Sequence, residues 1–506
     1  MKMLVGYGLI LALFAFVVLV LERSRRKDGS FTDYAVAGRS FGPWFQTMSF
    51  LNTWLPGTIF IVFAGFFAGG GVIGFYVTAY SLMAVMFMFF IAQPVHDWGR
   101  RFDLRTQADF VGMRYGSKAV RIVAAVIGVV SMFPWLVLGL QSLGLVFSYL
   151  SFGVVSPVEA VFVGIAVLGL RQIWTVRMGM RGVVISDMVQ GIVAYGVGGL
   201  VALGLLVGLL GEGHGLAALP PAFYALPGIG SEAGPMYYFS IVATGALGAW
   251  CWPDIFVRLF TARSTATIKR SSLQAATILF LFINLLGLMA MVAHSLPEVA
   301  AAPDRVWFIV AERAGVLVLS IAGVAVLAAT MGNISALTAA LGTQVAQDVV
   351  HVGGGAPDAT VTRTAKTAVV GATLLGVAGA VATVNVTSGL LTLALTSYQG
   401  IVQLAPALFL GLIWRRGNAA AAIAGMVSGF AVAAVLQLEY PLSIPWAWGL
   451  TSGVVGMAVN AVLYVLVSVL MPVSAQERER VDELFDSLHP AAAGAAPAQR
   501  SGLRAA

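Results

Sequence analysis

Apolar segments of about twenty residues recur about thirteen times along this chain of 506 residues. A helix needs about twenty residues to cross the hydrocarbon core of a bilayer, and within lipid its backbone groups must be satisfied inside the helix or by neighbouring helices. The pattern therefore predicts an all-α polytopic membrane protein with about 13 transmembrane helices. The expected spans cover residues 3–22, 43–68, 72–95, 119–150, 156–176, 182–211, 237–258, 272–294, 315–349, 366–384, 388–413, 418–437 and 446–471.

The composition agrees with a chain that is mostly surrounded by lipid. Hydrophobic residues make up 59% of the chain and charged residues 10%, far from the balance of a soluble domain. The net charge of +7 would suggest nucleic acid as a ligand of a soluble protein. Here the basic residues lie at the ends of apolar segments, where they meet anionic lipid headgroups. We therefore expect the lipid bilayer and a small-molecule solute as partners, with no nucleic acid and no obligatory protein partner.

The basic residues are distributed unevenly among the gaps between apolar segments. Of the 29 Lys and Arg residues, all but Lys2, Arg305 and Arg313 lie in every second gap or in the C-terminal tail. Loops rich in Lys and Arg stay cytoplasmic, so the amino terminus is expected outside and the carboxyl terminus inside. The sequence thus predicts a multi-pass protein of the cell inner (plasma) membrane.

Two regions follow from this pattern. Residues 1–475 form the expected transmembrane domain, and residues 476–506 form a cytoplasmic tail. Within the tail, residues 476–488 are charged and amphipathic, and residues 489–506 are rich in Ala, Gly and Pro. Because such a segment has little apolar surface to bury, we expect the tail to be largely disordered.

Helix breakers lie near the middle of two expected spans. They are Pro56 and Gly57 in the second span, and Pro253 in the seventh. Freed backbone groups at mid-membrane are tolerated where they line a cavity. The breaks are five spans apart, which places the second helix upside down relative to the first and predicts two inverted five-helix repeats around one central site. The simpler alternative is that each proline only kinks its helix.

Neutral polar side chains gather just before the first break and along the ninth span. Such groups can coordinate a small cation or bind a polar solute without burying a fixed charge. The alternative for both sets is hydrogen bonding between packed helices. The candidates are Gln46, Thr47, Ser49, Asn52 and Thr53 in the second span, and Thr330, Asn333, Ser335 and Thr338 in the ninth.

Three carboxylates, Asp187, Asp254 and Asp348, lie near or within spans, and a carboxylate retained there needs a partner or a function. Asp187 follows Arg177 and Arg181, and we expect a structural contact with this loop. Asp254 precedes Arg258 by four residues, a spacing that favours an ion pair over proton transfer. On this interpretation the membrane interior offers no free Lys or Arg to a solute.

The chain carries no HExxH or P-loop motif, and its single cysteine and five scattered histidines cannot assemble a disulfide framework or a Cys/His metal site. Without a nucleophile–base or metal constellation, we expect no enzyme, no catalytic residues and no cofactor. Solute uptake would have to use an ion gradient or the solute's own gradient.

Four blocks of sequence resemble, in the same order, those of the sodium:solute symporters, whose members import proline, sugars, pantothenate, acetate and other monocarboxylates. The resemblance covers most of the chain, and the order of the blocks is more specific than any single block. The blocks are residues 37–44 (AGRSFGPW), 181–190 (RGVVISDMVQ), 258–264 (RLFTARS) and 399–425, which contains Pro406 and Trp414-Arg415-Arg416.

This resemblance implies a secondary active transporter with a leucine-transporter-type fold of thirteen helices. The 5+5 inverted repeats would be residues about 43–211 and 237–413, and the spans 3–22, 418–437 and 446–471 would be peripheral. Import would proceed by alternating access, with a cation as the coupling ion. A transporter-like solute sensor is the alternative from another functional class.

The family holds its sodium ion between backbone carbonyls of the second span and a hydroxyl pair of the ninth. The carbonyls correspond to about Trp44 and Thr47, and the hydroxyl pair falls on Gly332 and Asn333, neither of which has a hydroxyl. A cation would instead use the side-chain oxygens of Asn333 and of Ser335 or Thr330. The hypothesis is that this chain has an altered cation site and couples to protons, uses sodium weakly, or transports without coupling.

Residues 131–135 (SMFPW) and the downstream Gln141 are similar to the monocarboxylate-importing branch of the family. The resemblance favours a small carboxylate, with an amino acid or a sugar as the alternative. The carboxylate would meet half-helix amino-terminal dipoles. The predicted solute-binding residues are Gln46, Asn52, Thr53, Gln141, Trp250 and Trp252.

Overall fold

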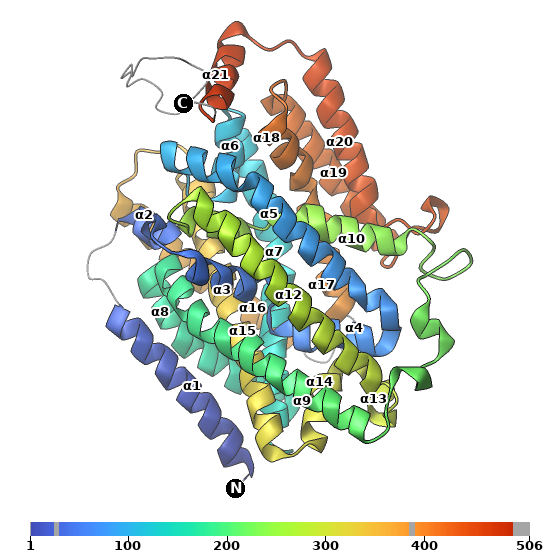
Figure 1. Cartoon of the computed structure of the whole chain (residues 1–506). Coiled ribbons are helices and arrows are strands. Elements are labelled where there is room, and N and C mark those ends of the chain that lie inside the picture. The colour runs from blue at the N-terminus through green and yellow to red at the C-terminus, as the bar shows by residue number, and fades with distance from the viewer. Residues whose placement is uncertain (1, 25–29, 384–389, 489–506) are drawn as a thin grey trace.

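The computed structural model describes residues 2–24, 30–383 and 390–488 (Figure 1). The described residues are helical throughout, apart from turns, loops and two isolated β-bridges. Figure 1 shows a bundle of long helices in which the first turn of α1 and the short helix α21 lie at opposite ends.

Ten helical stretches in the described part of the chain are long and apolar enough to cross a membrane. An eleventh consists of the pair Tyr237–Cys251 and Pro253–Thr261, which is bent by 50°. The prediction of an all-helical polytopic membrane protein is therefore confirmed. Two of the ten stretches, Gly57–Arg101 and Glu159–Gly211, contain 45 and 53 residues, more than a single crossing needs.

A glycine with positive φ interrupts each of these two long stretches. Gly71 has φ 68° and separates α4 from the next helical turn, and Gly179 has φ 56° within α8. A Cβ atom at Gly179 would lie 2.3 Å from the Tyr34 carbonyl oxygen, so both the backbone conformation and the available space require glycine there.

The helices in the first half of the chain fall within or near the ranges expected from the sequence, but a single stretch, Glu159–Gly211, covers the two expected at 156–176 and 182–211. The helices are α1 (Lys2–Ser24), α2 (Phe31–Val36), α3 (Pro43–Trp54), α4 (Val62–Gly70), α5 (Tyr76–Arg101), α6 (Gln107–Arg114), α7 (Lys118–Leu150), α8 (Pro157–Gly191) and α9 (Gly198–Gly211).

The second half matches as well, with shifted boundaries; the span expected at 366–384 begins at Asp358. The helices are α10 (Tyr237–Gly248), α11 (Pro253–Thr261), α12 (Thr265–Ala293), α13 (Pro297–Ala301), α14 (Val306–Arg313), α15 (Val316–Gln344), α16 (Asp358–Ala382), α17 (Leu390–Ile401), α18 (Gly411–Ile413), α19 (Ala419–Glu439), α20 (Ser452–Leu470) and α21 (Ala475–Asp486).

Both predicted helix breaks are present. Helix α3 ends at Trp54 because Pro56 has no N–H to donate and disfavours a helical conformation at Leu55, whose ψ is 76°. A short 3-10 turn, Gly57–Phe60, then leads into α4. At the second break Trp252 is extended, with ψ 124°, and Pro253 opens α11 at the position where proline is tolerated.

Helix α15 is the buried centre of the bundle and passes both breaks. Gly57 of the first break lies so close to α15 that a Cβ atom there would be 1.8 Å from the Thr330 hydroxyl oxygen. A Cβ atom at Gly332 of α15 would be 1.6 Å from the Asn52 amide nitrogen. The absence of side chains at these two glycines allows the broken helix to contact α15 directly.

The basic loops of the sequence pattern contact one another. Arg39 pairs with Asp103 at 3.0 Å, Arg181 with Asp33 at 3.8 Å, and Phe41 forms a β-bridge with Ala262. These loops therefore share one end of the bundle, as the alternation of charge predicts.

Helix α21 covers most of the charged, amphipathic part of the tail. It spans residues 475–486, and its N-cap is Ser474. Arg480 donates hydrogen bonds to the carbonyls of Met113 (3.1 Å) and Arg114 (3.0 Å). The amphipathic spacing of residues 476–488 was the signal for this helix. Residues 489–506 lie outside the described residues.

Candidate functional site

A small cavity of about 30 Å³ lies between the two helix breaks. It is buried inside the bundle, and its volume is enough for about one water molecule. Because solute pockets usually measure hundreds of Å³, a solute can enter only when these helices move apart. The lining residues are Thr53, Trp54 and Pro56 of the first break, Trp252, Asp254 and Ile255 of the second, Asn333 and Leu337 of α15, Trp135 of α7 and Tyr398 of α17.

Three aromatic rings from three different elements close this cavity. The ring of Trp252 is 5.5 Å from that of Tyr398 and 6.3 Å from that of Trp135, and Trp135 is 6.0 Å from Tyr398. The rings are almost perpendicular to each other, the edge-to-face geometry that aromatic pairs prefer. These contacts link α7, α11 and α17 around the site.

A buried ionic cluster lies beside the cavity. The Arg258 guanidinium is 3.2 Å from the Asp187 carboxylate, and both side chains are fully buried. Asp187 also accepts hydrogen bonds from Ser49 Oγ (2.7 Å) and Asn52 Nδ2 (3.1 Å). Arg258 donates to Thr53 Oγ1 at 2.8 Å. The cluster thus joins α3, α8 and α11.

This cluster corrects two expectations from the sequence. Asp187 pairs with Arg258 and not with the arginines of the preceding loop. Asp254 forms no ion pair within the described ranges, and its carboxylate accepts a hydrogen bond from the Ile255 N–H at 3.1 Å. Neither of the two fully buried arginines is free for a solute, since Arg258 pairs with Asp187 and Arg171 donates to Ser186 Oγ at 2.6 Å.

Four of the residues predicted from the sequence meet at the cavity, namely Thr53, Pro56, Trp252 and Asn333. Two others lie in the surrounding hydrogen-bond network. Asn52 contacts Asp187, and Gln46 bonds to the Arg258 carbonyl and accepts from Thr261 Oγ1 at 2.9 Å.

Other predicted solute-binding residues lie elsewhere. Gln141 donates to Thr383 Oγ1 at 2.8 Å and does not line the cavity. Trp250 is fully buried, donates to the Ala84 carbonyl at 2.8 Å and stacks on Phe50 with a ring separation of 5.6 Å. Both side chains have packing partners in the described structure. Trp135 and Tyr398 line the cavity instead. Trp135 lies within the similar segment 131–135, and Tyr398 directly precedes the similar block 399–425.

Side-chain oxygens are scarce at the family's sodium position. Trp44 and Thr47 would contribute backbone carbonyls there, and the Thr47 hydroxyl bonds to Gln274 of α12 at 2.8 Å. Gly332 offers no side-chain oxygen, and Asn333 points its N–H₂ group at the Thr53 carbonyl, 3.1 Å away. A sodium ion needs several oxygen ligands in a closed cage.

The other two predicted cation ligands do not complete such a cage. Thr330 Oγ1 donates to the Val326 carbonyl of its own helix at 2.8 Å. Ser335 Oγ is buried and has no hydrogen-bond partner among the described residues. Nearby, the Arg258 guanidinium already brings a positive charge to the oxygens of Asp187 and Thr53.

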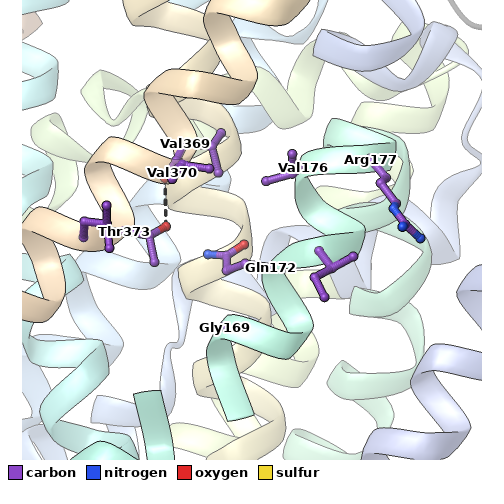
Figure 2. A pocket seen from close by; sticks show the side chains of 9 residues that line it. Gly169, Gln172, Val176, Arg177, Val369, Val370 and Thr373 are labelled. Carbon is purple, nitrogen blue, oxygen red and sulfur yellow. Dashed lines mark hydrogen bonds between the residues drawn. The ribbon is translucent and has the colours of Figure 1, made fainter. Parts of the chain in front are cut away.

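A larger cavity of about 390 Å³ lies between α8 and α16, away from both breaks. Figure 2 shows Gln172 and Val176 on one side and Val369, Val370 and Thr373 on the other. Its lining is mostly apolar, and Ile173, Val370 and Leu374 are exposed on the surface of the bundle. This groove has the character of a lipid-facing surface and lacks the converging polar groups of a solute site.

Comparison with known proteins agrees with this geometry. Residues 34–429 match the sodium:solute symporter family. The chain is 24% identical over 280 residues to the uncharacterized symporter YhjB of Bacillus subtilis (strain 168), a match that covers 54% of this chain and 56% of that protein. It is 22% identical over 483 residues to the uncharacterized symporter YodF of the same organism, covering 92% of each chain.

A third relative has a more specific name. The chain is 24% identical over 302 residues to the monocarboxylate transport permease protein of Rhizobium johnstonii, a match that covers 57% of this chain and 60% of that protein. The chain thus spans little more than half the length of two of these three relatives.

Solved structures show the same fold. A Na⁺-coupled sialic acid symporter in a substrate-bound, outward-open state has a TM-score of 0.74 at 16% identity, covering 92% of this chain and 98% of that one. A nucleobase-cation-symport-1 family transporter in a closed conformation has a TM-score of 0.55 at 15% identity, covering 90% and 99%. The fold, the broken helices and the extent of the sequence match lead to one conclusion: the chain belongs to the sodium:solute symporter family and is a secondary transporter, not an enzyme.

Proposed function

We propose that this transporter imports a small organic solute with a carboxylate group, by alternating access through the cavity between the two breaks. The observation that carries the proposal is the convergence of both breaks, α15 and three aromatic rings on one buried space. The cavity is smaller than any such solute, which fits a closed state between two open ones.

The amino-terminal end of α11 supports an anionic solute group. Trp252, Asp254 and Ile255 line the cavity, and α11 begins at Pro253. The positive end of a helix dipole favours a carboxylate. The relative named as a monocarboxylate transport permease supports the same class of solute. We assign solute contact to Thr53, Trp252 and Asn333, with Asn52 and Gln46 holding the surrounding network.

The topology belongs to the same proposal. Dividing the two long stretches at Gly71 and Gly179 and counting each broken helix once gives thirteen crossings, arranged as inverted repeats of residues 43–211 and 237–413. The contacts among the basic loops support a cytoplasmic position for that end of the bundle. The amino terminus then lies outside the plasma membrane, with residues 1–475 as the transport domain.

Solute exchange in proteoliposomes tests the proposal. Vesicles loaded with unlabelled pyruvate, lactate, acetate, proline or glucose are diluted into labelled solute, and counterflow is measured against protein-free vesicles. We expect counterflow with at least one monocarboxylate, and loss of at least about 90% of it in Trp252→Ala, since a buried aromatic contact is worth more than about 1 kcal/mol. Faster exchange of proline or glucose than of every monocarboxylate would contradict the assignment.

A further inference from the structure

Asp254 differs from the other carboxylates buried in the membrane region. Asp187 pairs with Arg258 at 3.2 Å, and Asp348 pairs with Arg121 at 2.6 Å. Asp254 is 5% exposed, lines the cavity, and forms no ion pair in the part of the chain that the structure describes. Its carboxylate accepts the Ile255 N–H of its own helix turn.

The groups around Asp254 offer no free positive charge. On its own helix Arg258 lies four residues away, and its guanidinium is held by Asp187 and Thr53. Among the described residues that line the cavity from other elements there is no Lys, Arg or His, and Tyr398 of α17 is the further titratable side chain. The remaining lining residues are uncharged. A buried carboxylate without an ion-pair partner is costly to keep ionised, so the closed cavity favours its neutral, protonated form.

A carboxylate solute strengthens this argument, which here rests on the proposed function. Two ionised carboxylates in one closed space repel each other, and one of them takes up a proton. The family's sodium position is poorly equipped to supply the compensating charge, because Gly332 has no side-chain oxygen and Asn333 presents its N–H₂ group to the Thr53 carbonyl.

We propose that Asp254 carries the coupling proton of this transporter, in place of the sodium ion used in its family. Asp254 binds one proton from the outer side, the solute carboxylate enters, and both are released on the inner side. One negative and one positive charge cross together, so each transport cycle moves no net charge.

Imposed gradients across proteoliposomes test the source of the driving force. Uptake of labelled pyruvate is compared under an inward proton gradient, an inward sodium gradient at equal pH, and no gradient, with protein-free vesicles as the control for passive entry. A one-unit pH gradient should raise pyruvate accumulation by up to about tenfold, since that gradient supplies about 1.4 kcal/mol per proton. The sodium gradient should give no increase.

Two variants separate proton coupling from a structural role. Asp254→Asn keeps the shape of the neutral carboxyl and should retain pyruvate counterflow, while losing the proton-driven accumulation. Glu439→Gln removes an exposed carboxylate at the end of α19 and should leave both activities unchanged. A purely structural Asp254 would lose counterflow and accumulation to the same extent.

The outcomes are distinguishable. Pyruvate accumulation that follows sodium and ignores pH, or that survives in Asp254→Asn, overturns the assignment of Asp254 and leaves carboxylate import intact. Loss of counterflow and accumulation together in Asp254→Asn also overturns it. Absence of counterflow with every monocarboxylate tested contradicts the proposed function itself, and with it the solute-based argument for Asp254.

Discussion

At the scale of single residues, the charges beside the candidate site are paired within the protein itself. The Arg258 and Asp187 side chains are completely buried at 3.2 Å, and hydrogen bonds from Ser49 and Asn52 satisfy the carboxylate. Removing one member of a buried ion pair leaves the other charge uncompensated and lowers stability. Replacing both members by apolar residues can leave stability nearly unchanged. The pair therefore fixes how α11 is seated against α3 and α8.

We predict that Arg258→Met lowers stability by about 3–5 kcal/mol, because Asp187 is left charged and buried. The double variant Arg258→Met/Asp187→Leu should regain most of this loss. Thermal unfolding of the purified protein in one detergent, followed by a thiol-reactive dye or by tryptophan fluorescence, measures both. Equal melting temperatures for the single and double variants would show that the two side chains do not act as a pair.

At the scale of elements, the contact between the first break and α15 decides the shape of the site. Pro56 ends α3, and Gly57 allows the chain to lie directly against Thr330 and the Val326 carbonyl. A Cβ atom at Gly57 would be 2.8 Å from this carbonyl oxygen, which is backbone and cannot rotate away. The glycine is thus required by space, although its φ is not left-handed.

Gly57→Ala should destabilise the protein by about 1–3 kcal/mol and reduce transport, because overpacking forces the break away from α15. Gly371→Ala is the matched control: this glycine lies within α16, and a Cβ atom there would meet nothing within 4 Å. The control should be neutral or slightly stabilising, by up to about 1 kcal/mol. Melting temperatures and counterflow of both variants provide the test, and an unchanged Gly57→Ala protein would contradict the close contact.

The sequence predicted these elements well and their side-chain partners poorly. Apolar length and proline position locate spans and breaks, since both depend on local backbone chemistry. The partner of Arg258 could not be read in the same way, because Asp187 is 71 positions away in sequence and meets it only through packing. The (i, i+4) spacing favoured Asp254 as the partner. Arg258 pairs instead with Asp187, whose carboxylate also accepts hydrogen bonds from Ser49 and Asn52.

At the scale of the whole molecule, the loops at one end of the bundle form a connected layer. Arg39 with Asp103, Arg181 with Asp33, and the Asp358 carboxylate accepting the Phe31 N–H at 3.2 Å tie together loops far apart in sequence. Most of the basic residues lie in the loops of this end, and the alternation of charge predicts a cytoplasmic position for it.

Cysteine labelling tests this orientation. The one native cysteine, Cys251, is buried, so a membrane-impermeant thiol reagent should give little background. In intact cells we expect Glu232→Cys, in the loop before α10, to react and Gly354→Cys, in the loop before α16, to react only after the membrane is permeabilised. Labelling of Gly354→Cys alone in intact cells would reverse the orientation.

Helix α21 adds a constraint on motion. It bonds through Arg480 to the carbonyls of Met113 and Arg114 beside α6, and its residues Asp482 and Asp486 pair with Arg415, which follows α18, at 2.8 and 2.7 Å. These anchor points lie in different halves of the chain. Because α21 is bonded to both halves, it limits how far they can separate at that end. Any opening of the protein there requires α21 to move with one half and to break its bonds to the other.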